Sequence, residues 1–289
     1  MIRLIGIDVD GTLLDSSGEM PSENIAAIHE AVAAGIHVAL VTGRSYPFVR
    51  PVADPLPHTI SLIVSNGAVE RAMDGRTLAS RLLDREVARA VLHETRSFRD
   101  SAAVIFDRAV DRQMVFETMD WDHPSRKGYW ARNQSLIART TPLEDALTED
   151  PIQVMFNGGV AAMRQLATTL RGMSAAAGVA SSRGDELNVP DFAVALTEYE
   201  PRDFSLVDVT APQATKGQAL AWRAARLGLS RDEVMAVGDN FNDVEMLEFA
   251  GVPVLMGNAV PALKARGWAV TGHHDQAGLA DAIRRFALS

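Results

Sequence analysis

The sequence predicts an α/β fold, in which a Rossmann-like core domain built on a parallel sheet carries an inserted α+β domain. In the first third of the 289 residues, short apolar runs of strand length alternate with helical segments, and the same alternation returns in the last third. Such alternation is typical of parallel βαβ units. The middle third instead has two helical segments among several short strand-like runs, which is typical of an α+β module. We therefore expect a core domain at 1–81 and 211–289, and an inserted domain at 82–210.

The elements of the first third follow from apolar runs and helix-end signals. Residues 4–7 (LIGI) predict a buried strand that ends at an acidic loop. Ser22 is the expected N-cap of a helix whose apolar residues recur at helical spacing and which stops at Gly35. The two strands expected next are 36–41 and 62–64.

The other two thirds are assigned in the same way. The last third is expected to contain helices at 218–227, 243–249 and 276–286, and strands at 234–237, 252–255 and 268–270. The middle third is expected to contain helices at 86–96 and 160–176, and strands at 103–106, 114–116, 152–156, 193–196 and 204–209. The middle third therefore differs in its organisation from the two thirds that flank it.

Composition excludes several classes of function. The chain has no cysteine, which excludes disulfides, thiolate metal sites and a cysteine nucleophile. It has 28 Lys+Arg against 37 Asp+Glu and no basic stripe, so no nucleic-acid partner is expected. No signal peptide or membrane span is visible, so we expect a cytoplasmic location and no membrane partner. The sequence leaves open whether the protein is a monomer or a homodimer.

The sharpest motif is DVDGTL at residues 8–13, directly after the first strand. In an extended segment, residues two apart point the same way, so Asp8 and Asp10 are expected to project together. Two adjacent carboxylates repel each other unless a cation or a shared proton intervenes, which suggests a hard metal ion. The alternative is an ordinary loop of turn-forming residues.

A second acidic loop, GDNFND at 238–243, follows the strand predicted at 234–237. Asp239 could supply a further metal ligand at the same edge of the sheet. Asn242 and Asp243 lie where a helix begins, and N-capping is their simpler explanation. Asp243 is also well placed to hold a neighbouring lysine by an ion pair.

Two further segments have the chemistry of an anion site. Thr42, Gly43 and Arg44 follow the second strand, where a hydroxyl and free backbone N–H groups suit phosphate oxygens. Lys216 lies at the start of a predicted helix and would add a positive charge. Taken alone, the Thr42–Arg44 segment could equally be a common turn, and Lys216 could equally be a solvated surface lysine.

The order of these segments resembles the haloacid dehalogenase superfamily of phosphohydrolases. Its four motifs match DVDGTLL at 8–14, Thr42, Lys216 and GDNFND at 238–243. The inserted middle third corresponds in position to the α+β cap, of the type called C2, of the Cof-type sugar-phosphatase branch. SNGA at 65–68, which contains Asn66, also resembles that branch. The segment before Lys216, APQAT, departs from the usual Pro-x-Gly-Val approach of the family.

The resemblance implies roles for the motif residues. Asp8 is expected to be the nucleophile that forms an aspartyl-phosphate, and Asp10 the general acid and base. A Mg²⁺ cofactor is expected on the side chains of Asp8 and Asp239 and the backbone carbonyl of Asp10. The residues expected to bind the substrate phosphate are Thr42, Gly43, Lys216 and Asn242, and those expected to support the site are Arg44, Asn66 and Asp243.

The predicted function is hydrolysis of small phosphorylated metabolites, with sugar phosphates the expected substrates. The cap is expected to close over the core and to select the substrate. A phosphomutase with the same aspartyl-phosphate is one alternative, and a catalytically silent sensor of phosphorylated ligands is another. His273, His274 and Asp275 could bind a metal ion but are expected to form a surface loop.

Overall fold

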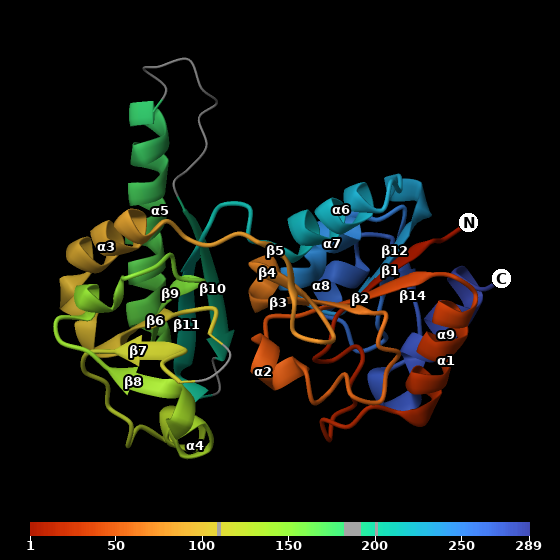
Figure 1. The fold of residues 1–289 in the computed structure, drawn as a ribbon, viewed down its shortest axis with the longest axis horizontal. Coiled ribbons are helices and arrows are strands. Elements are labelled where there is room, and N and C mark those ends of the chain that lie inside the picture. The colour runs from red at the N-terminus through yellow and green to blue at the C-terminus, as the bar shows by residue number, and fades with distance from the viewer. Residues whose placement is uncertain (109–110, 182–191, 200–201) are drawn as a thin grey trace. The chain divides into compact units, whose positions relative to one another are not determined.

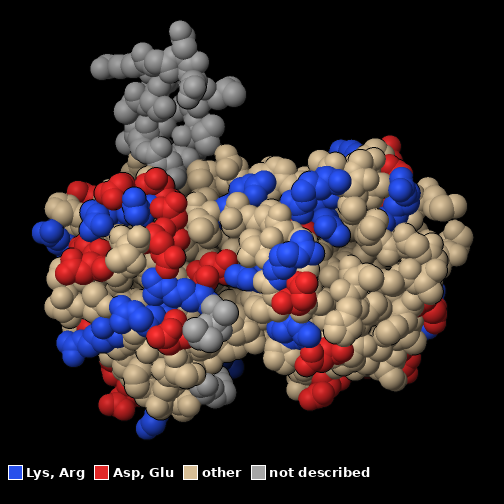
Figure 2. Space-filling model, viewed as in Figure 1, with Lys and Arg blue, Asp and Glu red and all other residues tan. Residues whose placement is uncertain are grey.

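The computed structural model describes residues 1–108, 111–181, 192–199 and 202–289. The chain forms two compact units, of which the first comprises Met1–Ser80 with Ala214–Ser289 and the second Arg81–Gln213 (Figure 1). In Figure 2, acidic and basic side chains are both visible on each unit. None of the described helices has both the length and the hydropathy of a membrane span.

A single sheet forms the centre of the first unit. Its strands are β1 (Leu4–Ile7), β2 (His37–Val41), β3 (Ser61–Val64), β4 (Val69–Ala72), β5 (Thr77–Ser80), β12 (Val234–Gly238), β13 (Val252–Leu255) and β14 (Ala269–Val270). They lie in the order β14-β13-β12-β1-β2-β3-β4-β5. The strands from β14 to β3 are parallel, as predicted, whereas β4 and β5 add an antiparallel hairpin at one edge.

Helices cover both faces of this sheet. They are α1 (Ser22–Ala33), α2 (Tyr46–Val49), α6 (Lys216–Arg226), α7 (Val244–Phe249), α8 (Pro261–Lys264) and α9 (Gly278–Phe286). The apolar residues of α6 and α7 pack against β1, β2 and β12 in one buried cluster. Helices α1 and α9 lie side by side, joined by an ion pair between Glu30 and Arg284 (Figure 1). The result is the three-layer arrangement expected of a doubly wound α/β domain.

The start of α1 differs from the sequence prediction. Pro21, not Ser22, occupies the N-cap position, and its carbonyl accepts the backbone N–H groups of Asn24 and Ile25. Ser22 is already the first helical residue, and its hydroxyl donates to Glu23 at 3.1 Å. The predicted cap was therefore wrong by one position.

The second unit has its own sheet and its own core. Its strands are β6 (Ala102–Ile105), β7 (Met114–Phe116), β8 (Ile137–Arg139), β9 (Gln153–Gly158), β10 (Ala193–Tyr199) and β11 (Phe204–Thr210), in the order β10-β11-β9-β6-β7-β8. Its helices are α3 (Arg85–Glu94), α4 (Pro124–Asn133) and α5 (Val160–Ser181). Apolar residues of α3 and α5 pack on one face of the sheet and form the main core of the unit. On the opposite face, Trp121 and Trp130 pack against Phe116 with ring-centroid distances of 5.2 and 6.5 Å.

Candidate active site

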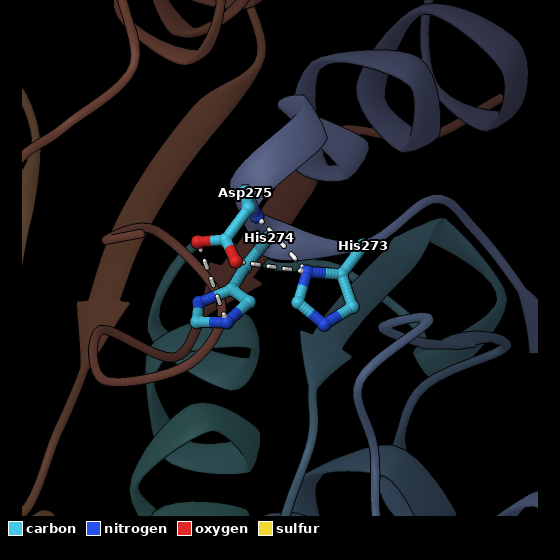
Figure 3. Close-up of side chains that lie close together, drawn as sticks. All are labelled: His273, His274 and Asp275. Carbon is cyan, nitrogen blue, oxygen red and sulfur yellow. Dashed lines mark hydrogen bonds and ion pairs between the residues drawn. The ribbon is translucent and has the colours of Figure 1, made fainter. Parts of the chain in front are cut away.

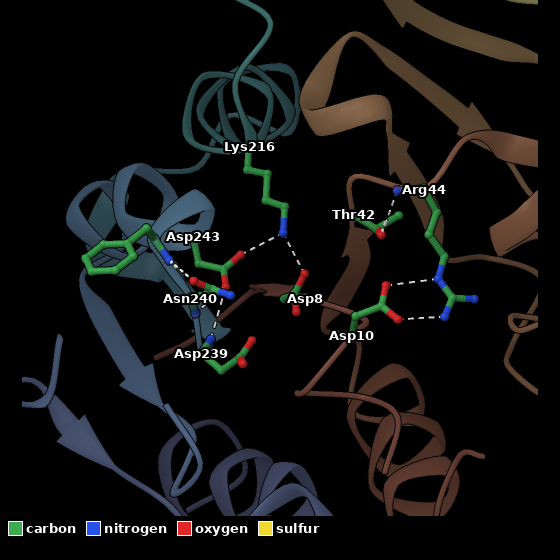
Figure 4. Close-up of polar contacts among 9 residues, drawn as sticks. Asp8, Asp10, Thr42, Arg44, Lys216, Asp239, Asn240 and Asp243 are labelled. Carbon is green, nitrogen blue, oxygen red and sulfur yellow. Dashed lines mark hydrogen bonds and ion pairs between the residues drawn. The ribbon is translucent and has the colours of Figure 1, made fainter. Parts of the chain in front are cut away.

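The predicted motifs meet at the carboxyl edge of the first unit's sheet. β1 lies between β12 and β2, and Ile7 at its end is opposite Val237 and Leu40. The loops that leave these three parallel strands therefore emerge side by side, as is usual for ligand sites in open α/β sheets. Lys216, the first residue of α6, reaches the same place (Figure 4).

A buried lysine joins two of the motifs. The Lys216 ammonium donates to Asp8 Oδ1 at 2.6 Å and to Asp243 Oδ1 at 2.7 Å. All three side chains are almost completely excluded from solvent, with exposures of 1%, 6% and 0%. The ion pair between Lys216 and Asp243 is the one that the sequence suggested. A buried ammonium is stable only because both carboxylates compensate its charge.

Asp243 also shapes the loop that contains Asp239. Its Oδ2 accepts the backbone N–H groups of Asp239 and Asn240, each at 3.0 Å. Asn240 in turn accepts the N–H of Phe241 through its own side chain. The sequence predicted capping by Asn242 and Asp243, whereas the capping interactions involve Asn240 and Asp243. Both oxygens of Asp243 are thus engaged within the protein.

Two glycines make the close approach of these segments possible. A Cβ on Gly238 would lie 2.6 Å from the Cβ of Asp243. A Cβ on Gly67, whose φ is +102°, would lie 2.3 Å from the backbone oxygen of Thr215, the residue before Lys216. Any larger residue at either position would displace an element that carries the ion pairs.

The site carries more negative than positive charge. Three carboxylates, those of Asp8, Asp239 and Asp243, surround the single ammonium of Lys216. Burial, followed by the charge of Asp243, raises the pKa of Asp8 to about 8, although Lys216 acts in the opposite direction. The same two causes raise the pKa of Asp239 to about 6. For Lys216, the two carboxylates outweigh the effect of burial and raise its pKa above the usual value.

This arrangement fits a divalent cation. Asp8 uses one oxygen for Lys216 and keeps the other, while the buried Oδ1 of Asp239 has no hydrogen-bond partner within the described chain. One carboxylate oxygen of each of Asp8, Asp239 and Asp243 lies within 4.8 Å of the others. Because both oxygens of Asp243 are engaged, the free oxygens belong to Asp8 and Asp239. Carboxylate oxygens are the ligands that Mg²⁺ prefers.

Asp10 has a different environment from Asp8. Its two oxygens accept from Arg44 Nε at 2.9 Å and Arg44 Nη2 at 2.6 Å, which is a bidentate ion pair (Figure 4). The extended geometry assumed from the sequence does not hold here, because β1 ends at Ile7 and Val9 lies in a turn. The two aspartates consequently contact different cations, and the side chain of Asp10 is 60% exposed.

Thr42, Gly43 and Asn66 lie together beside this ion pair. Thr42 is buried, and its hydroxyl oxygen accepts the N–H of Arg44 at 3.1 Å, which leaves the hydroxyl hydrogen available. Asn66 has a left-handed backbone, and its N–H donates to the Thr42 carbonyl at 2.9 Å. Its buried Oδ1 has no partner in the described residues and lies 3.1 Å from where a Cβ of Gly43 would be.

One predicted residue is exposed, and the structure adds another residue to the group. Asn242 is exposed in the short 3₁₀ helix Phe241–Asp243, next to the buried Asp243. Asn258, which the sequence analysis missed, donates to the carbonyl of Gly11 at 2.7 Å and so holds the loop after β1. No local signal marks Asn258, because the two residues are 247 positions apart.

The chain is similar to known hydrolases along nearly all of its length. The sequence profile of haloacid dehalogenase-like hydrolases matches residues 5–283. Phosphatase YwpJ of Bacillus subtilis is 28% identical over 311 aligned residues, which cover 98% of this chain and 99% of the relative. Pyridoxal phosphate phosphatase YbhA of Escherichia coli is 28% identical over 292 residues, which cover 99% and 98%.

Other matches extend the comparison. A solved structure of a haloacid dehalogenase-like hydrolase from Bacteroides thetaiotaomicron has the same fold, with a TM-score of 0.77 at 22% identity over 99% of each chain. The chloroplastic endoribonuclease YBEY of Arabidopsis thaliana is 27% identical over 297 residues, and the chain spans 46% of its length. The chain therefore belongs to the haloacid dehalogenase-like hydrolase family, as its four motifs predict.

Proposed function

We propose that the protein hydrolyses small phosphorylated metabolites, sugar phosphates in particular, in a Mg²⁺-dependent reaction that passes through an aspartyl-phosphate on Asp8. One observation carries the proposal. The buried Lys216 ammonium holds Asp8 at the carboxyl edge of the sheet, next to the free oxygen of Asp239. The proposal is supported because the three groups that it needs, a nucleophile, a cation for the phosphoryl group and a metal ligand, would then belong to one site.

The residues that would hold Mg²⁺ are Asp8 and Asp239 through their side chains and Asp10 through its backbone carbonyl. The free carboxylate oxygens and the excess negative charge support this assignment. When bound, the ion supplies charge neutralisation that lets an anionic carboxylate approach an anionic phosphate.

Asp8 would attack phosphorus with one of its carboxylate oxygens and leave the other for Mg²⁺, and the bond from phosphorus to the leaving alkoxide would break. The Lys216 ammonium, already oriented by Asp243, would stabilise the negative charge on the phosphoryl oxygens. The Thr42 hydroxyl and the Gly43 N–H would donate to the same oxygens, since no described residue accepts the Thr42 hydroxyl hydrogen.

Asp10 would protonate the leaving oxygen and then take a proton from the water that hydrolyses the aspartyl-phosphate. Its exposed position gives it access to both substrate and water. The ion pair with Arg44 must open before Asp10 can carry a proton. A phosphate oxygen competes with Asp10 for the Arg44 guanidinium, so we expect substrate binding itself to release Asp10.

The substrate class is inferred from the family. The E. coli relative is named for pyridoxal phosphate, a small phosphorylated metabolite. The resemblance of the motifs to the Cof-type branch favours sugar phosphates, and we propose that the inserted unit selects among them. Asn242 and Asn66 remain candidates for phosphate contact and for support of the site.

The test is phosphate release from sugar phosphates, pyridoxal phosphate, nucleotides and an aryl phosphate, with Mg²⁺ and with chelator. Asp8→Asn should abolish release, whereas Asp232→Asn, at an exposed position of the same unit, should not change it. Borohydride reduction during turnover should convert Asp8 to homoserine, detectable by peptide mass. Release that persists in Asp8→Asn would refute the nucleophile assignment.

Two other outcomes would favour the alternative functions. Isomerised substrate without net phosphate release would indicate a phosphomutase. Binding of phosphorylated compounds by the folded protein without any turnover would indicate a sensor.

A further inference from the structure

The segment between β13 and α8 joins the two loops that carry proposed metal ligands. The backbone N–H of Val260 donates to the Asp239 carbonyl at 3.1 Å, which holds the loop after β12. The side chain of Asn258 donates to the Gly11 carbonyl at 2.7 Å, which holds the loop after β1. One short segment therefore binds both loops, one through its backbone and the other through a side chain.

The two loops are in close contact where this segment joins them. Gly11 has a φ of +86°, and a Cβ at this position would lie 2.6 Å from Asp239 Oδ2. The Asp10 carbonyl, which we assign to Mg²⁺, directly precedes Gly11 in the chain. A shift of Gly11 would therefore change the separation between the Asp10 carbonyl and the Asp239 carboxylate.

The side-chain amide of Asn258 is engaged at both ends. Its Nδ2 donates to the Gly11 carbonyl, and its Oδ1 accepts the backbone N–H of His274 at 3.1 Å. A carbonyl can only accept and an N–H can only donate, so the two contacts fix the orientation of the amide. Beside Asn258, the N–H of Gly257 donates to the Gly272 carbonyl at 2.9 Å. The segment is thus tied to the turn that contains His274.

That turn, which comprises His273, His274 and Asp275, holds the loop after β1 further along the chain (Figure 3). His274 Nδ1 is 2.9 Å from the Leu14 carbonyl, which can only accept, so this nitrogen carries the hydrogen and donates it. Asp275 Oδ1 accepts the backbone N–H of Ser16 at 2.7 Å. His273 and Asp275 are partly exposed, as expected of a surface loop, whereas the His274 side chain is only 14% exposed.

We propose that Asn258 and His274 are positioning residues of the active site, which keep the Asp10 carbonyl and the Asp239 carboxylate at the separation that Mg²⁺ needs. The inference rests on the proposed function, because that proposal assigns both ligands. Asn258 and His274 themselves contact neither the ion nor the substrate. Outer partners of metal ligands orient them, and removal of such a partner typically weakens metal affinity by about 10–100-fold.

The test is calorimetric titration of the metal-free full chain with Mg²⁺, at a temperature at which every variant is folded. Asn258→Ala and His274→Ala should each weaken Mg²⁺ binding by at least about tenfold. His274→Asn should retain most of the affinity, because its amide nitrogen, like His Nδ1, is attached to Cγ and can donate to the Leu14 carbonyl. A purely structural role of the two residues would lower stability and leave Mg²⁺ affinity unchanged.

Two control variants separate positioning from a general loss of stability. His58→Ala, at an exposed histidine of the same unit, should bind Mg²⁺ as the unaltered protein does. Ile28→Val removes a buried methylene group from α1 and so lowers stability, but it touches none of the hydrogen bonds of Asn258 and His274. Its Mg²⁺ affinity should equal that of the unaltered protein.

Phosphate release gives a second measurement. The Mg²⁺ concentration for half-maximal release should rise in Asn258→Ala and His274→Ala in proportion to the loss of affinity. Unchanged Mg²⁺ affinity in the alanine variants, or an equal loss in Ile28→Val, would overturn the inference while the proposed function stands. The expected pattern of Mg²⁺ binding in a protein that releases no phosphate would refute the proposed function alone. Absence of Mg²⁺ binding by the unaltered protein would overturn both.

Discussion

Replacement of Lys216 by methionine tests the charge balance of the site directly. The substitution preserves most of the side-chain length but removes the ammonium that lies 2.6 Å from Asp8 and 2.7 Å from Asp243. Two almost fully buried carboxylates then lose their shared cation. Removal of one partner from a buried ion pair costs about 3–5 kcal/mol, because it leaves uncompensated charge in the interior.

The effect on melting follows from this figure. A unit of about 150–250 residues loses about 2–4 °C in Tm for each kcal/mol, so Lys216→Met should melt about 6–20 °C below the unaltered protein. The stability of the variant should also depend on pH. Lys216 lowers the pKa of Asp8, so without the ammonium Asp8 holds its proton still more tightly in the folded state than in the unfolded state. Stability of the variant should therefore fall as the pH rises from 5.5 to 8.

The assay is thermal unfolding in chelator at pH 5.5 and pH 8, with Lys264→Met as the control. Lys264 is an exposed lysine of the same unit, so its replacement should change Tm by little at either pH. Phosphate release by Lys216→Met should fall by about 10²–10³-fold or more. A destabilisation no larger than that of Lys264→Met, or a Tm of Lys216→Met that is no lower at pH 8 than at pH 5.5, would refute the reasoning.

Three further predictions concern the same unit. Without metal, the free energy of unfolding should fall as the pH rises from about 4 to about 8, because the pKa values of Asp8 (about 8) and Asp239 (about 6) are above the ordinary 3.8. Mg²⁺ should restore stability most at pH 8. Melting curves with and without chelator test both expectations. Gly67→Ala should lower the free energy of unfolding by at least about 2 kcal/mol in urea titrations, since its φ is +102° and the new Cβ would meet backbone. Asn258→Ala should lower the free energy of unfolding by about 1–3 kcal/mol in the same titrations, because the Gly11 carbonyl loses its hydrogen-bond donor. An unchanged urea midpoint of Gly67→Ala or of Asn258→Ala would contradict the contact on which that prediction rests.

Much of the first unit could be predicted because its signals are local. The strands β1, β2, β3, β12 and β13 are short apolar runs, and the chemistry-bearing loops directly follow three of them. Parallel pairing then brings those loops to one edge whatever their separation in sequence. The contact of Lys216 with Asp243 was suggested in another way, by the acidic residue in the 238–243 loop and by the match of both residues to motifs of the family.

The sequence analysis missed the edge hairpin of β4 and β5 because its strands lack a regular polar–apolar pattern. Its strands do not alternate cleanly, because Glu70 is buried and forms ion pairs with Arg223 and Arg226. A buried acid with distant partners contradicts the polar-outside pattern on which strand prediction depends. The Asp74-Gly75 dipeptide, a common hairpin turn, was the available signal.

The site geometry could be predicted only in part. Asp8 and Asp10 are residues of the same type, two positions apart in one motif. Nothing in the local sequence indicates that their surroundings differ. Their difference arises from Arg44, which is 34 positions from Asp10, and from Lys216, which is 208 positions from Asp8. Contacts of this kind depend on the tertiary fold, and so only the structure reveals them.

These surroundings suit the two aspartates to different tasks. Asp8 is buried and retains a single free oxygen, so it can present that oxygen in one direction while water is kept away from the rest of the group. Asp10 is exposed and bound to an arginine, so it can exchange one partner for another and reach solvent. A nucleophile needs fixed direction, whereas a general acid and base must meet the leaving group and then water. An exchange of the two environments would remove both abilities, and this supports the proposal that Asp8 attacks phosphorus and Asp10 transfers the proton.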